Sequence, residues 1–204
     1  MVVIGMTGGT GAGKGEISLL FERFDIPCLD TDRVSRLVCG PDMPCTCVLA
    51  EEFGREILTP DGCLKRKELA QIVFGEPDDE LRAKKIERLN TITHAFILDS
   101  CRVWLDTKEK EGCRAAVIDA PQLFESGFDT ECAKILGVTA DKETRIARIM
   151  ARDKITREKA EDRIAAQHTD DFFYEHCDAV IENNGELSAL YPRLAEILRQ
   201  WQLL

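Results

Sequence analysis

A glycine-rich run that ends in a lysine stands near the start of the chain and could bind phosphate groups. It fits the pattern G-x-x-x-x-G-K and consists of Gly8, Gly9, Thr10, Gly11, Ala12, Gly13 and Lys14. Glycines let consecutive backbone N–H groups turn inward around an anion, because no Cβ blocks positive φ values. The lysine ammonium can then reach the β- and γ-phosphates of a nucleotide. The pattern predicts a phosphate-binding loop; the alternative is a glycine-rich turn with an exposed lysine.

The position after the lysine departs from this pattern. A serine or threonine usually stands there, and its hydroxyl ligates Mg²⁺. Here Gly15 and Glu16 follow, and neither residue offers a hydroxyl. Mg²⁺ keeps several waters in most protein sites, so a water can take the place of the missing ligand. Catalysis and nucleotide binding without catalysis therefore both remain open at this point.

Three aspartates follow apolar runs that are typical of buried strands. Asp30 and Asp32 come directly after Leu29, and Asp119 closes the run 116–118. Phosphoryl transfer to a hydroxyl group needs a carboxylate beside that group and oxygen ligands for a metal ion. Asp30 and Asp119 are therefore candidate Mg²⁺ ligands, directly or through water. The alternatives are helix N-capping for Asp30 or Asp32 and a purely structural role for Asp119.

Arginines cluster between positions 145 and 163. Arg145, Arg148 and Arg152 share one face of a predicted helix, because they are three and four residues apart. Such a cluster after the fourth predicted strand suits a lid that closes over ATP phosphates. The alternative is a solvated face balanced by neighbouring acidic side chains. The histidines at 94, 168 and 176 lack metal-ligand spacing, and each is expected to be an ordinary helix histidine.

Five short apolar runs predict the strands that would position these residues. They cover Val2–Met6, Ile26–Leu29, Ala115–Ile118, Lys134–Val138 and Ala179–Ile181. Near-continuous apolar strands that alternate with helices imply a parallel sheet covered on both faces. The fold class is therefore α/β, with three layers.

Helical patterns occupy most of the remaining chain. The longest covers 81–110, further helices are expected over 141–152 and from Thr156, and the tail 187–204 is amphipathic. The segment from about Asp42 to Lys110 holds no good strand. It predicts a helical insertion between the second and third strands.

Composition narrows the classes of protein that fit. With 204 residues, 27 Lys+Arg, 37 Asp+Glu and a net charge of -10, the chain is a poor candidate for nucleic-acid binding. No apolar run is long enough to span a membrane, and a signal peptide is not expected. The nine cysteines are scattered and include no CxxC pair, which favours reduced thiols and a cytoplasmic location.

Taken in order along the chain, these motifs resemble those of the dephospho-CoA kinase family, which completes coenzyme A synthesis. The matching segments are the loop Gly5–Lys14, the D-x-D motif Asp30–Asp32, the central pattern over 53–74, the third-strand motif Asp119–Gly127, the lid segments 148–153 and 163–167, and the last strand and turn over 178–185. The central pattern is the most specific of these, because other small kinases do not share it.

The resemblance implies a three-layer P-loop fold and transfer of the ATP γ-phosphoryl to the ribose 3′-hydroxyl of dephospho-CoA. It implies ATP and Mg²⁺ as cofactors, Asp32 as the base, and Arg66 and His94 as further acceptor-binding residues. The expected ATP ligands are the loop 8–16, Lys14, Arg148, Arg152 and Asn183. We expect a single kinase domain with a core over about 1–40 and 111–204, an insertion over about 41–110 and a lid over about 141–170. Its partners are small molecules, and the chain is expected to be a monomer or weak homo-oligomer.

Four departures from the family pattern leave two rivals open. Gly15 replaces a serine, Ala95 a proline and Gln122 a leucine, and the segment 168–178 lacks a lysine. One rival is another small-molecule or nucleotide kinase of the same fold, since fold alone does not fix the substrate. The other rival is a nucleotide-binding relative with weakened catalysis.

Overall fold

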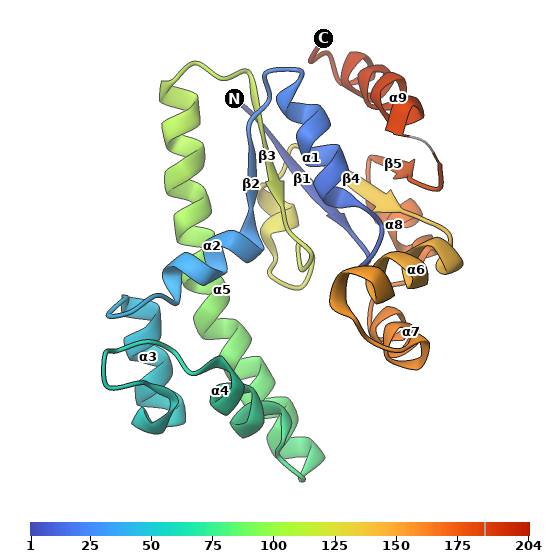
Figure 1. Ribbon diagram of the computed structural model, residues 1–204. Coiled ribbons are helices and arrows are strands. Elements are labelled where there is room, and N and C mark those ends of the chain that lie inside the picture. The colour runs from blue at the N-terminus through green and yellow to red at the C-terminus, as the bar shows by residue number, and fades with distance from the viewer. Residues whose placement is uncertain (186) are drawn as a thin grey trace. The chain divides into compact units, whose positions relative to one another are not determined.

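The computed structural model describes residues 1–185 and 187–204, which form two compact units (Figure 1). The first unit consists of Met1–Asp30 and Leu105–Leu204, and the second consists of Thr31–Trp104. The second unit thus begins ahead of the insertion expected from about residue 41.

A five-stranded parallel sheet forms the centre of the first unit. Its strands, in the spatial order β2-β3-β1-β4-β5, are β2 (Cys28–Asp30), β3 (Ala115–Asp119), β1 (Val2–Gly8), β4 (Lys134–Thr139) and β5 (Ala179–Glu182). Every residue of β3 is buried, as a central strand covered on both faces requires. All five strands predicted from the sequence are confirmed.

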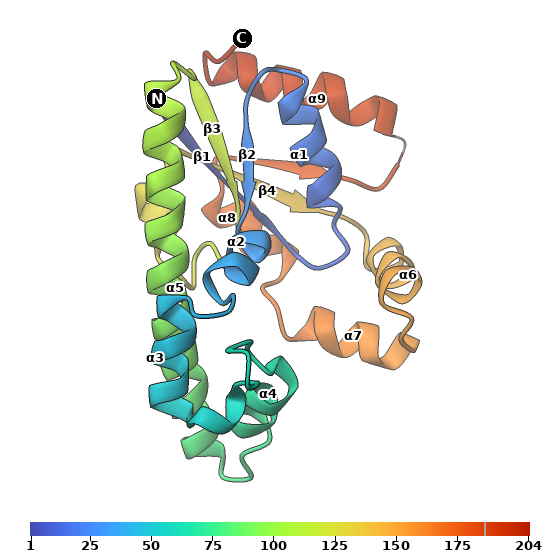
Figure 2. The ribbon, with the colours of Figure 1, turned by 60° about the vertical axis from the view of Figure 1, so that its left-hand side comes forward.

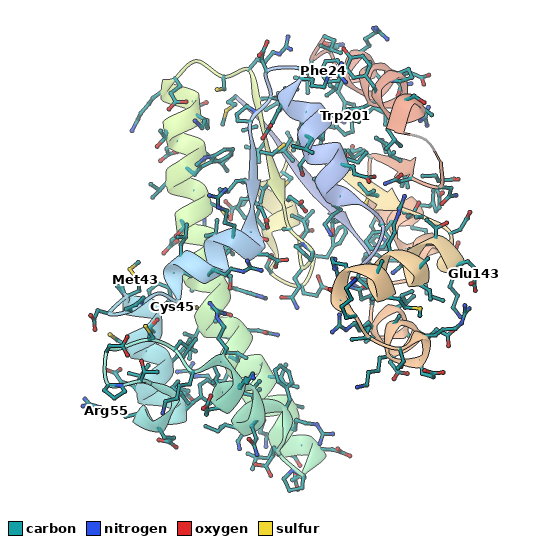
Figure 3. All side chains as sticks on the ribbon, in the orientation of Figure 1. Phe24, Met43, Cys45, Arg55, Glu143 and Trp201 are labelled. Atoms are coloured by element: carbon teal, nitrogen blue, oxygen red, sulfur yellow. The ribbon has the colours of Figure 1, made fainter. Side chains whose placement is uncertain are left out.

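One face of this sheet is covered by α1 (Lys14–Glu22) and α9 (Leu187–Gln200). Alternate residues of the inner strands, including Ile4, Met6, Leu136 and Val138, share one buried core with these two helices. Phe24, which follows α1, belongs to the same core, and Trp201, which follows α9, packs against it (Figure 3). The alternation is the period of two that a strand imposes on its side chains.

The opposite face is packed against α8 (Asp170–His176) and the short helix η2 (Phe128–Glu131) (Figure 2). A Cβ on Gly137 would lie 3.1 Å from Cys177 Sγ, and one on Gly5 would lie 2.8 Å from Cys132 Sγ. These glycines let the second layer approach the strands closely. The sheet is therefore covered on both faces, and the predicted three-layer α/β class is confirmed.

Helix α8 was not indicated by the sequence patterns. Its N-cap Thr169 accepts a hydrogen bond from Phe172 N at 3.4 Å, and Asp170 and Asp171 occupy its first turn. A threonine followed by two acidic residues is a recognised helix start. That signal could have revealed the helix.

Two helices form a hairpin after β4, in the part of the chain where a lid is expected. They are α6 (Lys142–Asp153) and α7 (Arg157–Ala165), with Asp141 and Thr156 as their N-caps. Ile146, Ile149 and Ala160 form a small buried cluster of their own, separate from the core of the sheet. The two helices predicted from the sequence here are confirmed.

The second unit is helical. Its elements are α2 (Thr31–Val38), α3 (Pro44–Phe53), the short helix η1 (Arg55–Ile57), α4 (Arg66–Phe74) and the first part of α5 (Asp79–Lys110), which continues into the first unit. Cys45 is buried at the start of α3, and Met43 and Arg55 lie just outside that helix (Figure 3). The only β-contact described in this unit is one isolated bridge, from Leu58 to Leu64. The expectation of a helical segment without a strand is confirmed.

Candidate functional site

The glycine-rich loop connects the end of β1 to the start of α1, as its sequence pattern requires. Gly11 and Gly13 have φ values of 78° and 90°, which favour glycine over other residues. A Cβ on Gly13 would also lie 2.2 Å from Asn183 Nδ2, and one on Gly11 would lie 2.8 Å from Arg145 O. The loop therefore needs glycine for backbone conformation and for space. It places backbone N–H groups beside the positive end of α1, an arrangement suited to phosphate.

Lys14 is the first residue of α1, and its side chain folds back along the loop. Its Nζ donates a hydrogen bond to Gly8 O at 3.2 Å. Gly15 is exposed in the first turn, and a Cβ built there would meet no atom within 4 Å. The site thus has room for the hydroxyl residue that the sequence lacks.

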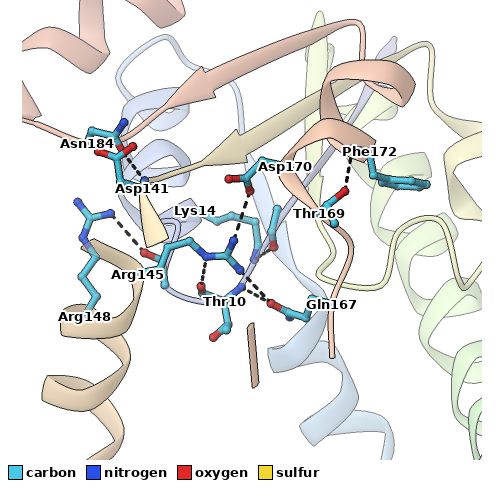
Figure 4. A network of polar contacts seen from close by, with 12 residues as sticks. Thr10, Lys14, Asp141, Arg145, Arg148, Gln167, Thr169, Asp170, Phe172 and Asn184 are labelled. Atoms are coloured by element: carbon cyan, nitrogen blue, oxygen red, sulfur yellow. Dashed lines mark hydrogen bonds and ion pairs between the residues drawn. The ribbon is translucent and has the colours of Figure 1, made fainter. Parts of the chain in front are cut away.

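Arg145 of α6 braces the loop from outside (Figure 4). Its Nε donates to Thr10 O at 3.0 Å, and its two Nη atoms donate to Asp170 Oδ1 at 3.3 Å and Gln167 Oε1 at 3.4 Å. Gln167 Oε1 also accepts from Thr10 N at 2.7 Å. The guanidinium is buried, and burial lowers its pKa while the Asp170 carboxylate opposes that shift. One side chain of α6 therefore ties the loop to the connection between α7 and α8 and to the first residue of α8.

The sequence places Arg145 in the arginine cluster but predicts no nucleotide-binding role for it. Its burial arises from packing of α6 against the loop, which residue spacing does not reveal. The available signal was its position: it lies one turn into the helix that follows β4, and the carboxyl ends of parallel strands gather at one edge.

Arg148 and Asn183 brace the same loop at its α1 end. Arg148 Nη1 donates to Gly11 O at 3.3 Å and Ala12 O at 3.4 Å, and its Nη2 donates to Asn183 Oδ1 at 3.2 Å. Asn183 is buried, and its Nδ2 donates to Ala12 O at 3.0 Å and Glu16 Oε2 at 2.7 Å. The predicted nucleotide ligands Arg148, Asn183 and Glu16 are thus assembled around the loop and joined to one another.

Arg152 lies further along the same helix face. Its Nη2 donates to Thr10 Oγ1 at 3.4 Å and to Asp153 Oδ2 at 2.9 Å. Arg152, and then Arg163, hold the pKa of Asp153 below its ordinary value. Arg157 instead pairs with Glu143 and Glu161 on the surface (Figure 3 labels Glu143). The arginine cluster therefore has two parts. Arg145, Arg148 and Arg152 contact the loop, whereas Arg157 belongs to a charged surface.

Asp30 and Asp119 lie side by side at the carboxyl edge of the sheet. They are register partners across β2 and β3, and Asp119 is also the partner of Met6 in β1. Asp119 is 8% exposed, whereas Asp30 is exposed. Ser18 Oγ of α1 lies 3.4 Å from Asp119 Oδ2 and donates to Lys14 O at 3.2 Å. This pairing of a hydroxyl with a buried carboxylate was not predicted from the sequence.

The carboxylate at 119 also affects a neighbouring thiol. Burial, together with the negative charges of Asp119 and Glu22, raises the pKa of the Cys28 thiol. Cys28 is therefore a packing residue between α1 and the sheet and not a nucleophile.

The three acceptor-side residues predicted from the family pattern all belong to the second unit. Asp32 is exposed as the second residue of α2, so of the two N-cap candidates only Asp30 directly precedes this helix. Arg66 is the exposed first residue of α4, and His94 is half-buried in α5. Their roles stay predictions.

The fold and the loop define the class of this protein. A parallel sheet ordered β2-β3-β1-β4-β5, a glycine-rich loop between β1 and α1, and arginines from the helix after β4 against that loop form a P-loop kinase domain.

Comparisons with known proteins give the family. The family model described as dephospho-CoA kinase matches residues 2–189. Dephospho-CoA kinases of Bacillus cereus and Corynebacterium glutamicum are 32% and 33% identical, covering 100% and 98% of this chain and 98% and 97% of their own lengths. A solved dephospho-CoA kinase from Campylobacter jejuni superposes with a TM-score of 0.69 over 97% of this chain and 96% of its own, at 20% identity. The last likeness supports the fold.

The chain belongs to the dephospho-CoA kinase family. It is accordingly an ATP-dependent kinase, and the family identified from the sequence motifs is confirmed. Among the helices of residues 1–185 and 187–204, none is long and apolar enough to cross a membrane.

Proposed function

We propose that the chain transfers the γ-phosphoryl group of MgATP to the ribose 3′-hydroxyl of dephospho-CoA, giving CoA and ADP. The observation that carries this proposal is the braced phosphate loop, in which Arg145 and Arg148 hold three loop carbonyl groups. Carbonyl groups held from outside leave the inner side of the loop to backbone N–H donors. The family match supplies the acceptor.

Binding of ATP is assigned to the first unit. The loop amides and Lys14 bind the β- and γ-phosphates, and the Lys14 ammonium leaves Gly8 O for a charged acceptor because charge-assisted hydrogen bonds are stronger. Arg148 and Arg152 neutralise charge at the outer side of the loop. Closure of the lid then excludes water, which would otherwise waste ATP by hydrolysis.

Binding and activation of the acceptor are assigned to the second unit. Asp32 accepts the proton of the 3′-hydroxyl group. The oxygen of that hydroxyl group bonds to the γ-phosphorus while the bond between this phosphorus and the β–γ bridging oxygen breaks. Arg66 and His94 bind the acceptor, and the exposed guanidinium of Arg66 suits an anionic group.

The donor set at the sheet edge fits Mg²⁺. Asp30 and Asp119 offer carboxylate oxygens on adjacent strands, and hard oxygen ligands are those that Mg²⁺ prefers. The ion, when bound with ATP, would neutralise charge on the transferring oxygens. These carboxylates hold it directly or through water, since Gly15 supplies no ligand.

We further propose the division of labour expected from the sequence: an acceptor-binding insertion over about 41–110 and a lid over about 141–170. The hairpin of α6 and α7, with its own buried cluster, supports the lid. All nine cysteines are free thiols, which supports a reducing, cytoplasmic location. We propose a monomer or weak homo-oligomer, which size-exclusion chromatography with light scattering can test.

The proposal is tested by measuring ADP release from MgATP with and without dephospho-CoA, with adenosine and AMP as control acceptors. Release that depends on dephospho-CoA, with CoA as product, is expected. Release with AMP or adenosine instead would favour a nucleoside or nucleotide kinase. ATP binding without turnover of any acceptor would favour the nucleotide-binding relative, and Gly15→Ser would then be the variant to assay.

A further inference from the structure

A serine lies on the face of α1 where the phosphate loop lacks its hydroxyl. Ser18 is three residues after Gly15, so the two positions share one side of the helix. Its hydroxyl lies 3.4 Å from Asp119 Oδ2 and donates to Lys14 O at 3.2 Å. Ser18 is half-buried, whereas Gly15 is exposed. The chain therefore has a hydroxyl one turn deeper than the usual position.

The surroundings of this hydroxyl are those of a hard-cation site. Asp119 is 8% exposed and stands beside Asp30 at the ends of adjacent strands. A buried carboxylate requires hydrogen bonds or a cation, because burial without them is costly. Cys28 Sγ donates to Ser18 O at 3.6 Å, which fixes this turn of α1 against β2. The hydroxyl and both carboxylates are thus held by regular secondary structure and not by a loop.

The single proton of the hydroxyl decides what Ser18 can do. When it donates to Lys14 O, the Oγ lone pairs can accept a hydrogen bond from a water. When it donates to Asp119 Oδ2, it fixes the direction of that carboxylate. Either state prepares this edge for a hydrated cation, because Mg²⁺ is commonly held through its own waters.

We propose that Ser18 is a positioning residue that, together with Asp119, holds the hydrated Mg²⁺ of MgATP in place of the hydroxyl that Gly15 lacks. This inference rests on the proposed function and assigns the metal-binding work of that site to a residue outside the phosphate-loop motif. It accounts for the tolerance of glycine at position 15. It also predicts that a hydroxyl group restored at position 15 makes Ser18 dispensable for binding of the metal ion.

The structure allows that prediction to be tested, because a Cβ at position 15 would meet no atom within 4 Å. Four proteins are compared: the natural chain, Ser18→Ala, Gly15→Ser and the double variant. Each is saturated with ADP, and Mn²⁺ is titrated in while the free ion is followed by electron paramagnetic resonance. Ser100→Ala is the matched control, since Ser100 also donates to the carbonyl four residues earlier, Phe96 O at 2.9 Å.

We expect Ser18→Ala to weaken Mn²⁺ binding about 10-fold, which corresponds to about 1.4 kcal/mol, and the control to change it little. The double variant should regain the affinity of the natural chain. Binding of ADP in EDTA, measured by calorimetry, should be the same for all four proteins. Unchanged Mn²⁺ affinity in Ser18→Ala would overturn the inference, and so would an equal loss of ADP binding in EDTA, which would mark a purely structural role.

Ser18→Thr covers the case in which the alanine variant does not fold. Threonine keeps the hydroxyl, so Mn²⁺ affinity should stay within about 3-fold of the natural chain; a 10-fold loss would count against the inference. None of these readouts uses the acceptor. A failure of dephospho-CoA turnover would therefore leave the assignment of Ser18 standing, and the two proposals fail separately.

Discussion

A methyl group added at Gly9 should displace Arg145 from the phosphate loop. A Cβ there would lie 2.2 Å from Arg145 Nη2 and 2.6 Å from its Cζ. The arginine must move, and movement breaks its bonds to Thr10 O, Asp170 and Gln167. The charged bond to Thr10 O is worth about 1.5–3 kcal/mol. The pair with Asp170 adds about 0.5 kcal/mol, discounted because that carboxylate is 42% exposed.

Gly9→Ala should therefore lower the free energy of unfolding by about 2–4 kcal/mol. In an Arg145→Ala background the obstacle is gone, and the same change should be neutral or stabilising by up to about 1 kcal/mol, because alanine restricts the unfolded chain. The coupling between the two positions should thus be about 2–5 kcal/mol. Urea unfolding of the four proteins of this cycle measures this coupling. Calorimetric titration with ADP shows whether displacement of Arg145 also weakens nucleotide binding by the loop.

Gly15→Ala is the matched control for this cycle. The glycine lies in the first turn of α1 with no atom within 4 Å of its Cβ position. Alanine there should stabilise the protein by up to about 1 kcal/mol. If Gly9→Ala costs the same with and without Arg145, or costs nothing, the argument that this arginine braces the loop is refuted.

Three further outcomes are expected. Asp32→Asn should lower kcat by about 10²–10⁴-fold and leave the ATP Kd unchanged; full activity in steady-state assays would exclude it as the base. Arg148→Ala should weaken ATP binding in calorimetry about 10-fold through loss of its loop contacts, whereas the surface variant Arg193→Ala, which loses only the pair with Glu196, should not. A hydrogen bond between the thiols of Cys39 and Cys45, whose sulfur atoms are 3.6 Å apart, lowers the pKa of Cys39. Cys45→Ala should therefore raise that pKa and move the pH profile of Cys39 alkylation, followed by mass spectrometry, to higher pH; an unmoved profile would contradict this.

The sheet and the phosphate loop could be predicted because their causes are local. Strands such as β3 are continuous apolar runs, and the glycines of the loop indicate backbone conformations that other residues avoid. The helical hairpin of α6 and α7 could be predicted from residue spacing and from Thr156 at a helix start. Boundaries shifted by only a few residues, mainly where β1 runs on to Gly8 and α5 begins at Asp79.

The inner workings of the site could not be predicted, because they depend on packing between distant segments. Ser18 and Asp119 are 101 positions apart and meet because β3 lies beside β1 in register. Arg145 is 135 positions from Thr10, and only the seating of α6 against the loop buries it. From sequence spacing, a solvated charged face was an equally good alternative for Arg145 and Arg157. Tertiary packing buries Arg145 against the loop and leaves Arg157 on the surface.

The separate apolar cluster of the α6–α7 hairpin has a thermodynamic consequence. Ile146, Ile149 and Ala160 form their own buried cluster within the hairpin, and Arg145 and Arg148 of α6 donate hydrogen bonds to the loop. If the hairpin opens as a unit, its cluster stays together, and the opening mainly exchanges these hydrogen bonds for bonds to water. Heat-capacity changes scale with exposed apolar area. The opening equilibrium should therefore have a nearly temperature-independent enthalpy, so that its van't Hoff plot is close to a straight line.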